Sequence, residues 1–138
     1  IGAGHEEINS NSMLLLKQDE SRTTGYAKFA TGGLTIAYQE AYQDSFTSSL
    51  LMNPDIEAEF FGVAYTMGDM TVSYGDSEMT TKAAGATAAL ITEELQSIQA
   101  AYVMGAMTVS AAMSETDNVG GVLAAKYEEN TLAVSFAF

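Results

Sequence analysis

Cysteine is absent from this sequence of 138 residues, and basic residues are scarce: five Lys and Arg stand against 18 Asp and Glu, for a net charge of −13. Without cysteine the chain can form no disulfide, no thiolate metal site and no thiol nucleophile. Without a basic surface it lacks what nucleic-acid binding needs, so we expect no nucleic-acid partner. No apolar run approaches the roughly 20 residues that a membrane helix requires.

Groups suited to covalent catalysis are also few. His5 is the single histidine, and nothing in the sequence pairs it with a nucleophile and an orienting acid. Adjacent carboxylates such as Glu6 and Glu7, or Glu128 and Glu129, point to opposite sides of an extended strand and cannot share a proton. No loop has the ligand spacing of a calcium site. We therefore expect no enzyme, no metal and no cofactor.

The end of the chain shows a clear strand pattern. In residues 131–138 (TLAVSFAF) the large apolar side chains Leu132, Val134, Phe136 and Phe138 alternate with small or polar ones, which is the period of a β-strand with two different faces. An exposed edge strand of this kind promotes aggregation in a soluble protein. In a closed barrel within lipid, the same strand places its apolar face against acyl chains.

A hairpin motif repeats along the chain. Residues 31–36 (TGGLTI), 67–72 (MGDMTV) and 104–109 (MGAMTV) are copies of one Gly-containing turn, and the residues flanking each turn alternate between large apolar and small or polar side chains. Each unit is predicted to contain two strands, a tight turn between them and a long polar connection to the next unit. This alternation of short and long connections is typical of an up-and-down barrel with short turns on one rim and long loops on the other.

The fold prediction is therefore all-β: an antiparallel up-and-down transmembrane β-barrel, formed by a single domain over residues 1–138. We expect about eight strands, at residues 1–9, 22–31, 33–44, 56–67, 70–80, 95–104, 107–117 and 128–138. Transmembrane β-strands need roughly 9–11 residues each, so the length suits eight strands and their loops. An apolar run at residues 13–16 and an Ala-rich stretch at residues 83–91, suited to a short helix, fall in predicted loops.

Most acidic residues fall in the predicted long connections or at the strand ends beside them. One interpretation is a solvated rim. Another is a pore mouth whose negative field favours cations. A third is divalent-ion bridging through carboxylates. The predicted pore-mouth and loop acids are Glu93, Glu94, Glu115, Asp117, Glu128 and Glu129.

Tyrosines lie near the predicted strand ends, where amphipathic rings can sit at the depth of lipid headgroups. Ordinary packing between paired strands is the alternative. The predicted aromatic girdle consists of Tyr26, Tyr38, Tyr65, Tyr74 and Tyr102.

The closing segment resembles the C-terminal end of alphaproteobacterial general porins. Its most specific parts are residues 115–120 (ETDNVG) and the terminus at residues 134–138 (VSFAF). The resemblance implies a homotrimer of 16-stranded barrels in the bacterial outer membrane, in contact with lipid and lipopolysaccharide. It also implies an assembly signal, read by the outer-membrane assembly machinery, at Phe138 with Phe136 and Val134.

A 16-stranded subunit needs roughly 300 residues or more, so the resemblance implies that these 138 residues are the C-terminal portion of a longer porin. The predicted function is a water-filled channel for passive diffusion of small hydrophilic solutes and ions, with cations favoured. The alternative is a closed eight-stranded outer-membrane barrel that acts as a structural anchor or adhesin, because side chains nearly fill a barrel of that size.

Overall fold

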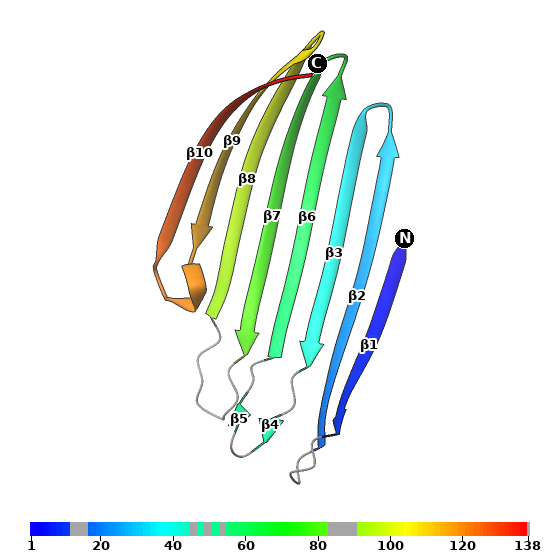
Figure 1. Ribbon diagram of the computed structural model, residues 1–138, viewed down its shortest axis with the longest axis vertical. Helices are drawn as coiled ribbons and strands as arrows, with labels where there is room; N and C mark the ends of the chain where they lie inside the picture. Colours follow the sequence, from blue (N-terminus) through cyan, green and yellow to red (C-terminus); the bar gives the residue numbers. More distant parts are fainter. Residues whose placement is uncertain (12–16, 45–46, 49–50, 53–54, 83–90, 138) are drawn as a thin grey trace.

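The computed structural model describes residues 1–11, 17–44, 47–48, 51–52, 55–82 and 91–137. It is built around one antiparallel sheet of eight strands in the order β1-β2-β3-β6-β7-β8-β9-β10, so each strand pairs with its neighbours in the chain (Figure 1). The strands are β1 (Gly2–Asn11), β2 (Lys17–Thr31), β3 (Leu34–Asp44), β6 (Asp55–Met67), β7 (Met70–Lys82), β8 (Ile91–Met104), β9 (Met107–Asp117) and β10 (Lys126–Phe136). A separate ribbon of two short strands, β4 (Thr47–Ser48) and β5 (Leu51–Met52), lies between β3 and β6 in the chain.

The prediction of eight antiparallel up-and-down strands is confirmed. Several strands extend further toward the long connections than their sequence pattern indicated: β2 begins at Lys17, β7 ends at Lys82 and β8 begins at Ile91. The cross-strand ladder continues there because backbone hydrogen bonding requires no alternation of apolar side chains. The apolar run at residues 13–16 and most of the Ala-rich stretch lie outside the described residues. Among the described residues, no helix is both long and apolar enough to cross a membrane.

The three predicted hairpin turns join β2 to β3, β6 to β7 and β8 to β9, each with two loop residues. Gly68 and Gly105 open the second and third turns with φ of 58° and 60°, a backbone conformation that glycine adopts without strain. Gly33 has φ of 88°, and a Cβ there would collide with the carbonyl oxygen of Thr66. The Thr66 amide donates a hydrogen bond of 2.9 Å to the Gly33 carbonyl, so this turn is held against β6.

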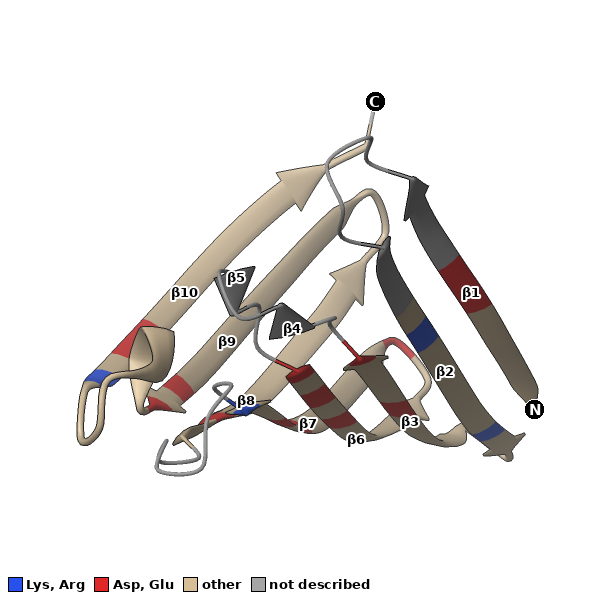
Figure 2. Cartoon of the chain, turned by 90° about the horizontal axis from the view of Figure 1, so that it is seen from below, with Lys and Arg blue, Asp and Glu red and all other residues tan. Residues whose placement is uncertain are grey.

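The sheet is bent into a trough (Figure 2). Strands β6 and β7 form its floor, and β1 and β10, the edge strands, form its two sides. The short turns lie at one end of the strands and the long connections at the other (Figure 1). The sheet is open in this chain, since β1 and β10 are not hydrogen-bonded to each other.

Successive strands are staggered. The row of paired residues that starts at Gly2, the first residue of β1, reaches β10 at Tyr127, its second residue. These two strands run in opposite directions, so the row passes from the short-turn end of one edge strand to the long-loop end of the other. Relative to this row, the midpoint of the strand shifts along the strand direction by roughly eight residues from β1 to β10, which are seven strand-to-strand steps apart. At about 3.3 Å per residue and 4.8 Å between strands, this shift corresponds to a strand tilt of roughly 40°.

Candidate channel wall

The middle of the concave face of the trough is formed mostly by small and polar side chains. Each residue on it is paired across the sheet with another residue of the same face, so one continuous surface runs over all eight strands. Small side chains suit the inner side of a curved sheet because side chains converge there. In the middle of the sheet these residues are Thr35, Ala37, Gly62, Ala64, Thr71, Ser73, Gly75, Ser97, Gln99, Ala101, Ser110, Ala112, Thr131 and Ala133.

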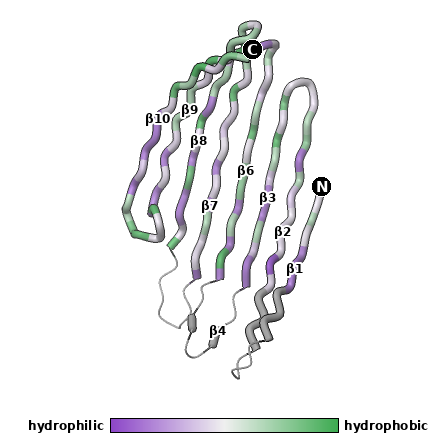
Figure 3. Tube along the Cα trace, viewed as in Figure 1, coloured by the Kyte–Doolittle hydropathy of each residue, from purple (hydrophilic) through white to green (hydrophobic). Residues whose placement is uncertain are grey.

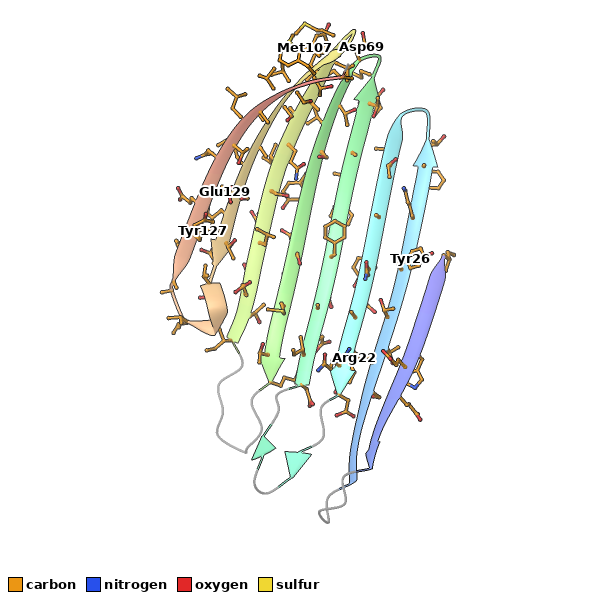
Figure 4. The ribbon with its side chains drawn as sticks, in the orientation of Figure 1. Arg22, Tyr26, Asp69, Met107, Tyr127 and Glu129 are labelled. Atoms are coloured by element: carbon orange, nitrogen blue, oxygen red, sulfur yellow. The ribbon has the colours of Figure 1, made fainter. Side chains whose placement is uncertain are left out.

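Hollows lie along this concave face. The largest has a volume of about 550 Å³ and is lined from β1, β2, β3 and β6, with Arg22, Gln39, Ala41 and Ala58 among its walls. A second, of about 270 Å³, lies around Phe60 between β3, β6, β7 and β8. Figure 4 labels Arg22 near the long-loop end of β3, where it contributes to the larger hollow. The concave surface is therefore hollowed and mostly uncharged.

The convex face carries an apolar band in the half nearest the short turns, and Figure 3 shows hydrophobic colour concentrated toward that end of the strands. The register joins its members across β2 to β10 into one band. No hydrophobic side chain among the described residues is buried, so the chain itself does not cover this band. It comprises Phe29, Leu34, Ile36, Phe61, Val63, Tyr65, Met67, Met70, Val72, Ile98, Tyr102, Met104, Met107, Val109, Leu132, Val134 and Phe136.

Toward the long loops the convex face becomes acidic, and Figure 2 shows red segments near the long-loop ends of several strands. Five carboxylates stand directly opposite one another on successive strands, and we call them the acidic row: Glu40, Glu59, Glu78, Glu94 and Asp117. Like charges in directly paired positions destabilise a sheet. The two-residue turns fix the Glu59–Glu78 and Glu94–Asp117 pairs, and the register across the long connections, which the sequence pattern does not reveal, joins these pairs and Glu40 into one row.

Two lysines offset part of this charge. Lys82 Nζ lies 2.8 Å from Glu57 Oε2, and this carboxylate raises the pKa of the lysine. Lys126 Nζ lies 2.8 Å from both Asp117 Oδ1 and Glu115 Oε1. The carboxylates of Asp117 and then Glu115, which accept hydrogen bonds from the ammonium group, hold the pKa of Lys126 above its usual range. All of these groups lie at the long-loop ends of their strands, beyond the apolar band.

The six predicted pore-mouth acids divide between the two faces. Glu94, Glu115, Asp117 and Glu128 lie on the convex face, on the same side as the apolar band. Glu93 and Glu129 lie on the concave face. Glu93 Oε2 accepts a hydrogen bond of 2.6 Å from the backbone amide of Gly120, so its carboxylate holds the loop between β9 and β10.

That loop is fixed by Asn118, which sequence analysis did not single out. Asn118 adopts a left-handed conformation with φ of 55° before a 3₁₀ turn, η1 (Val119–Gly121). Its side-chain amide donates a hydrogen bond of 2.8 Å to the Thr92 carbonyl, and its side-chain oxygen accepts one of 2.9 Å from the Ala124 amide. An Asn in a predicted loop is a weak signal, because asparagine is common in turns of every kind.

The predicted girdle tyrosines also divide between the faces. Tyr38, Tyr65, Tyr74 and Tyr102 lie on the convex face, two or four residues from the strand ends at the short turns. Tyr26 lies on the concave face opposite Gly2, where a Cβ at position 2 would collide with the Tyr26 ring.

Of the predicted assembly signal, Val134 and Phe136 lie on the convex face at the end of β10, and Phe138 lies outside the described residues. His5 Nδ1 lies 2.9 Å from Thr23 Oγ1, and His5 Nε2 lies 3.4 Å from Glu7 Oε1. No family model matches the chain, and no curated protein and no solved structure matches it.

Proposed function

We propose that this chain forms the wall of an outer-membrane β-barrel channel, through which small hydrophilic solutes and ions diffuse passively. The observation that carries the proposal is the division of one continuous sheet into two faces. The convex face bears an uncovered apolar band, and the concave face is mostly small and polar. A sheet of this kind suits a barrel with lipid outside and water inside.

The mechanism is physical. A solute that crosses the hydrocarbon must lose its water of hydration, whereas a water-filled lumen with a polar wall lets it keep most of that water. The hydroxyl and amide groups of Thr71, Ser73, Gln99 and Ser110 lie along the concave face and can hydrogen-bond to water. No covalent step is required, and none of the described contacts of His5 places it beside a serine.

The dimensions support a barrel. The stagger corresponds to a strand tilt of roughly 40°, within the range of about 35–45° for barrels. On β6 the apolar stretch from Glu59 to the strand end at Met67 spans eight positions, which is about 20 Å of depth at that tilt and is close to the usual apolar band of about 25 Å.

A lumen lined by glycine, alanine and serine favours a wide barrel over a filled one of eight strands. We therefore propose that the eight strands are part of a larger barrel, of the 16-stranded, homotrimeric kind that the resemblance implies. In that arrangement the chain lies in the bacterial outer membrane against lipid and lipopolysaccharide, and the end of β10 is the signal for the assembly machinery.

Any cation preference is small. Among the described side chains, the charged groups of the concave face are Glu6, Arg22, Lys28, Glu93 and Glu129, three acidic and two basic. The larger set of carboxylates, including the acidic row, lies on the convex face, where it acts on the membrane surface more than on the lumen. Reversal potentials in a salt gradient are expected to show a weak preference for cations, and a strong chloride preference would contradict this charge distribution.

A pair of single-cysteine variants tests the channel, because the natural sequence has no cysteine. Ser110 lies on the concave face and Val109 on the convex face, one position apart on β9. After insertion into a planar bilayer, Ser110→Cys is expected to react with a charged, water-soluble thiosulfonate and to show stepwise loss of current. Val109→Cys is expected to stay unreactive. A silent bilayer would favour the anchoring barrel, and faster reaction at position 109 would reverse the assignment of the faces.

A further inference from the structure

One row of the concave face differs from the rest of that face. It runs across seven strands, and every second member is large and apolar while the members between are polar. We call it the aromatic row: Tyr26, Gln39, Phe60, Ser77, Leu95, Thr116 and Tyr127, each paired with the next. Only the register brings these residues together, since they come from seven different strands.

The large members are open to the trough. Tyr26, Phe60, Leu95 and Tyr127 keep 52%, 41%, 40% and 54% of their surface exposed, on a face whose middle is made mostly of small and polar side chains. Figure 4 labels Tyr26 and Tyr127 on strands at the two sides of the trough. The row therefore spans the concave wall.

Two of the rings lie over glycines. A Cβ at Gly62 would come within 2.8 Å of Phe60 Cζ, and one at Gly75 within 3.4 Å of Phe60 Cε2. The Tyr26 ring occupies the corresponding space over Gly2. A glycine beneath a ring lets that ring lie against the wall, so that its outer face is turned toward the lumen.

The row follows an inclined path. Because it runs perpendicular to strands that tilt by roughly 40°, the path from Tyr26 to Tyr127 climbs roughly 18 Å along the trough axis. Consecutive large members are about 10 Å apart, twice the distance between strands. A solute that moves through the lumen can therefore pass from one apolar member to the next.

We infer that the aromatic row is a binding track for neutral, linear oligosaccharides. This inference rests on the proposed channel function and names the solute class. A sugar ring presents an apolar C–H face and a rim of hydroxyl groups. The track offers a large apolar side chain at every second position, with an aromatic ring at three of the four, and between them the amide of Gln39 and the hydroxyls of Ser77 and Thr116. None of its seven members is charged, which favours a neutral ligand over an ionic one.

Current recordings with maltohexaose as the probe test the track. The sugar is expected to interrupt the ion current through the full chain in a planar bilayer, with a saturable dependence on concentration. Polyethylene glycol of the same hydrodynamic size has no rings to stack and serves as the reference for simple exclusion. Phe60→Leu and Tyr127→Leu are each expected to raise the dissociation constant of maltohexaose by about three- to tenfold, the size of one aromatic contact.

Phe61→Leu is the matched control, because it makes the same change one position away on the convex face. It is expected to leave sugar binding unchanged. If Phe60 only covers glycines, Phe60→Leu will lower stability and leave the dissociation constant as it was, which overturns the track. If maltohexaose reduces a steady current no more than polyethylene glycol does, the binding track is refuted but the channel function is not. Absence of any current refutes both the binding track and the proposed channel function.

Discussion

Replacing Val63 with arginine is expected to destabilise the protein in a lipid bilayer, whereas replacing its neighbour Ala64 is not. Val63 lies in the apolar band on the convex face of β6, paired with Ile36 and Tyr74. Ala64 lies on the concave face, paired with Thr35. The two variants add the same side chain one position apart, so they differ only in which side of the sheet receives the charge.

The magnitude follows from the depth of Val63. The apolar stretch of β6 runs from Glu59 to the strand end at Met67 and corresponds to about 20 Å of depth at the observed stagger. Val63 is four positions from Glu59 and thus about 10 Å inside the nearer polar edge. A lipid-facing arginine near the midplane costs about 2–4 kcal/mol, and one near the interface about 0–1 kcal/mol. We expect Val63→Arg to lower the free energy of unfolding by about 2–3 kcal/mol, and Ala64→Arg by less than about 1 kcal/mol.

The assay is reversible unfolding by guanidinium chloride in lipid vesicles, followed by tyrosine fluorescence, since the chain has seven tyrosines and no tryptophan. Both variants are also measured in micelles of a zwitterionic detergent, where a smaller difference is expected because the arginine can reach water more easily. Equal losses at the two positions, or a larger loss for Ala64→Arg, would refute the assignment of the convex face to lipid.

Three further predictions concern the long-loop end. Glu59→Gln is expected to raise the free energy of unfolding by roughly 0.5–1 kcal/mol at low ionic strength, because it removes two like-charge pairs from the acidic row; a gain that persists at 1 M salt would contradict the electrostatic cause. Glu115→Gln is expected to lower the pKa of Lys126, measured by NMR of ¹³C-methylated lysine, because it removes one of two carboxylates that favour the ammonium. Since the pKa of Lys126 is raised on folding, its ion pair with the two carboxylates stabilises the fold at neutral pH. This stabilisation is lost only as the pH rises past the ordinary lysine pKa of about 10.4 and through the folded-state pKa. An unchanged pKa of Lys126 in the Glu115→Gln variant would rule out the ion pair. Asn118→Ala is expected to lower the free energy of unfolding by about 1–3 kcal/mol, because it removes two side-chain hydrogen bonds and strains a position with φ of 55°; Asn118→Gly, which keeps the backbone conformation, is expected to cost less, and equal losses would exclude the strain.

The sequence was sufficient for the local architecture. Alternation of large and small side chains identifies strands because successive side chains of a strand point to opposite faces. Glycine at the first position of the turns at Gly68 and Gly105 fixes two-residue hairpins, since such turns need a positive φ. From these two signals the number, the order and the antiparallel pairing of the eight strands followed, along with the side of each strand on which the large apolar residues lie.

The tertiary structure alone decided which residues meet across strands that long connections join. A two-residue turn fixes the register of its own hairpin, but a connection such as residues 83–90 allows the next strand to slide by several positions. That freedom is resolved only when all eight strands pair. The pairing then aligns Glu78 with Glu94 on the convex face and places Phe60 in one row with Tyr26 and Tyr127 on the concave face. Composition predicted an acidic rim, but only the register could decide which carboxylates stand opposite one another across the long connections.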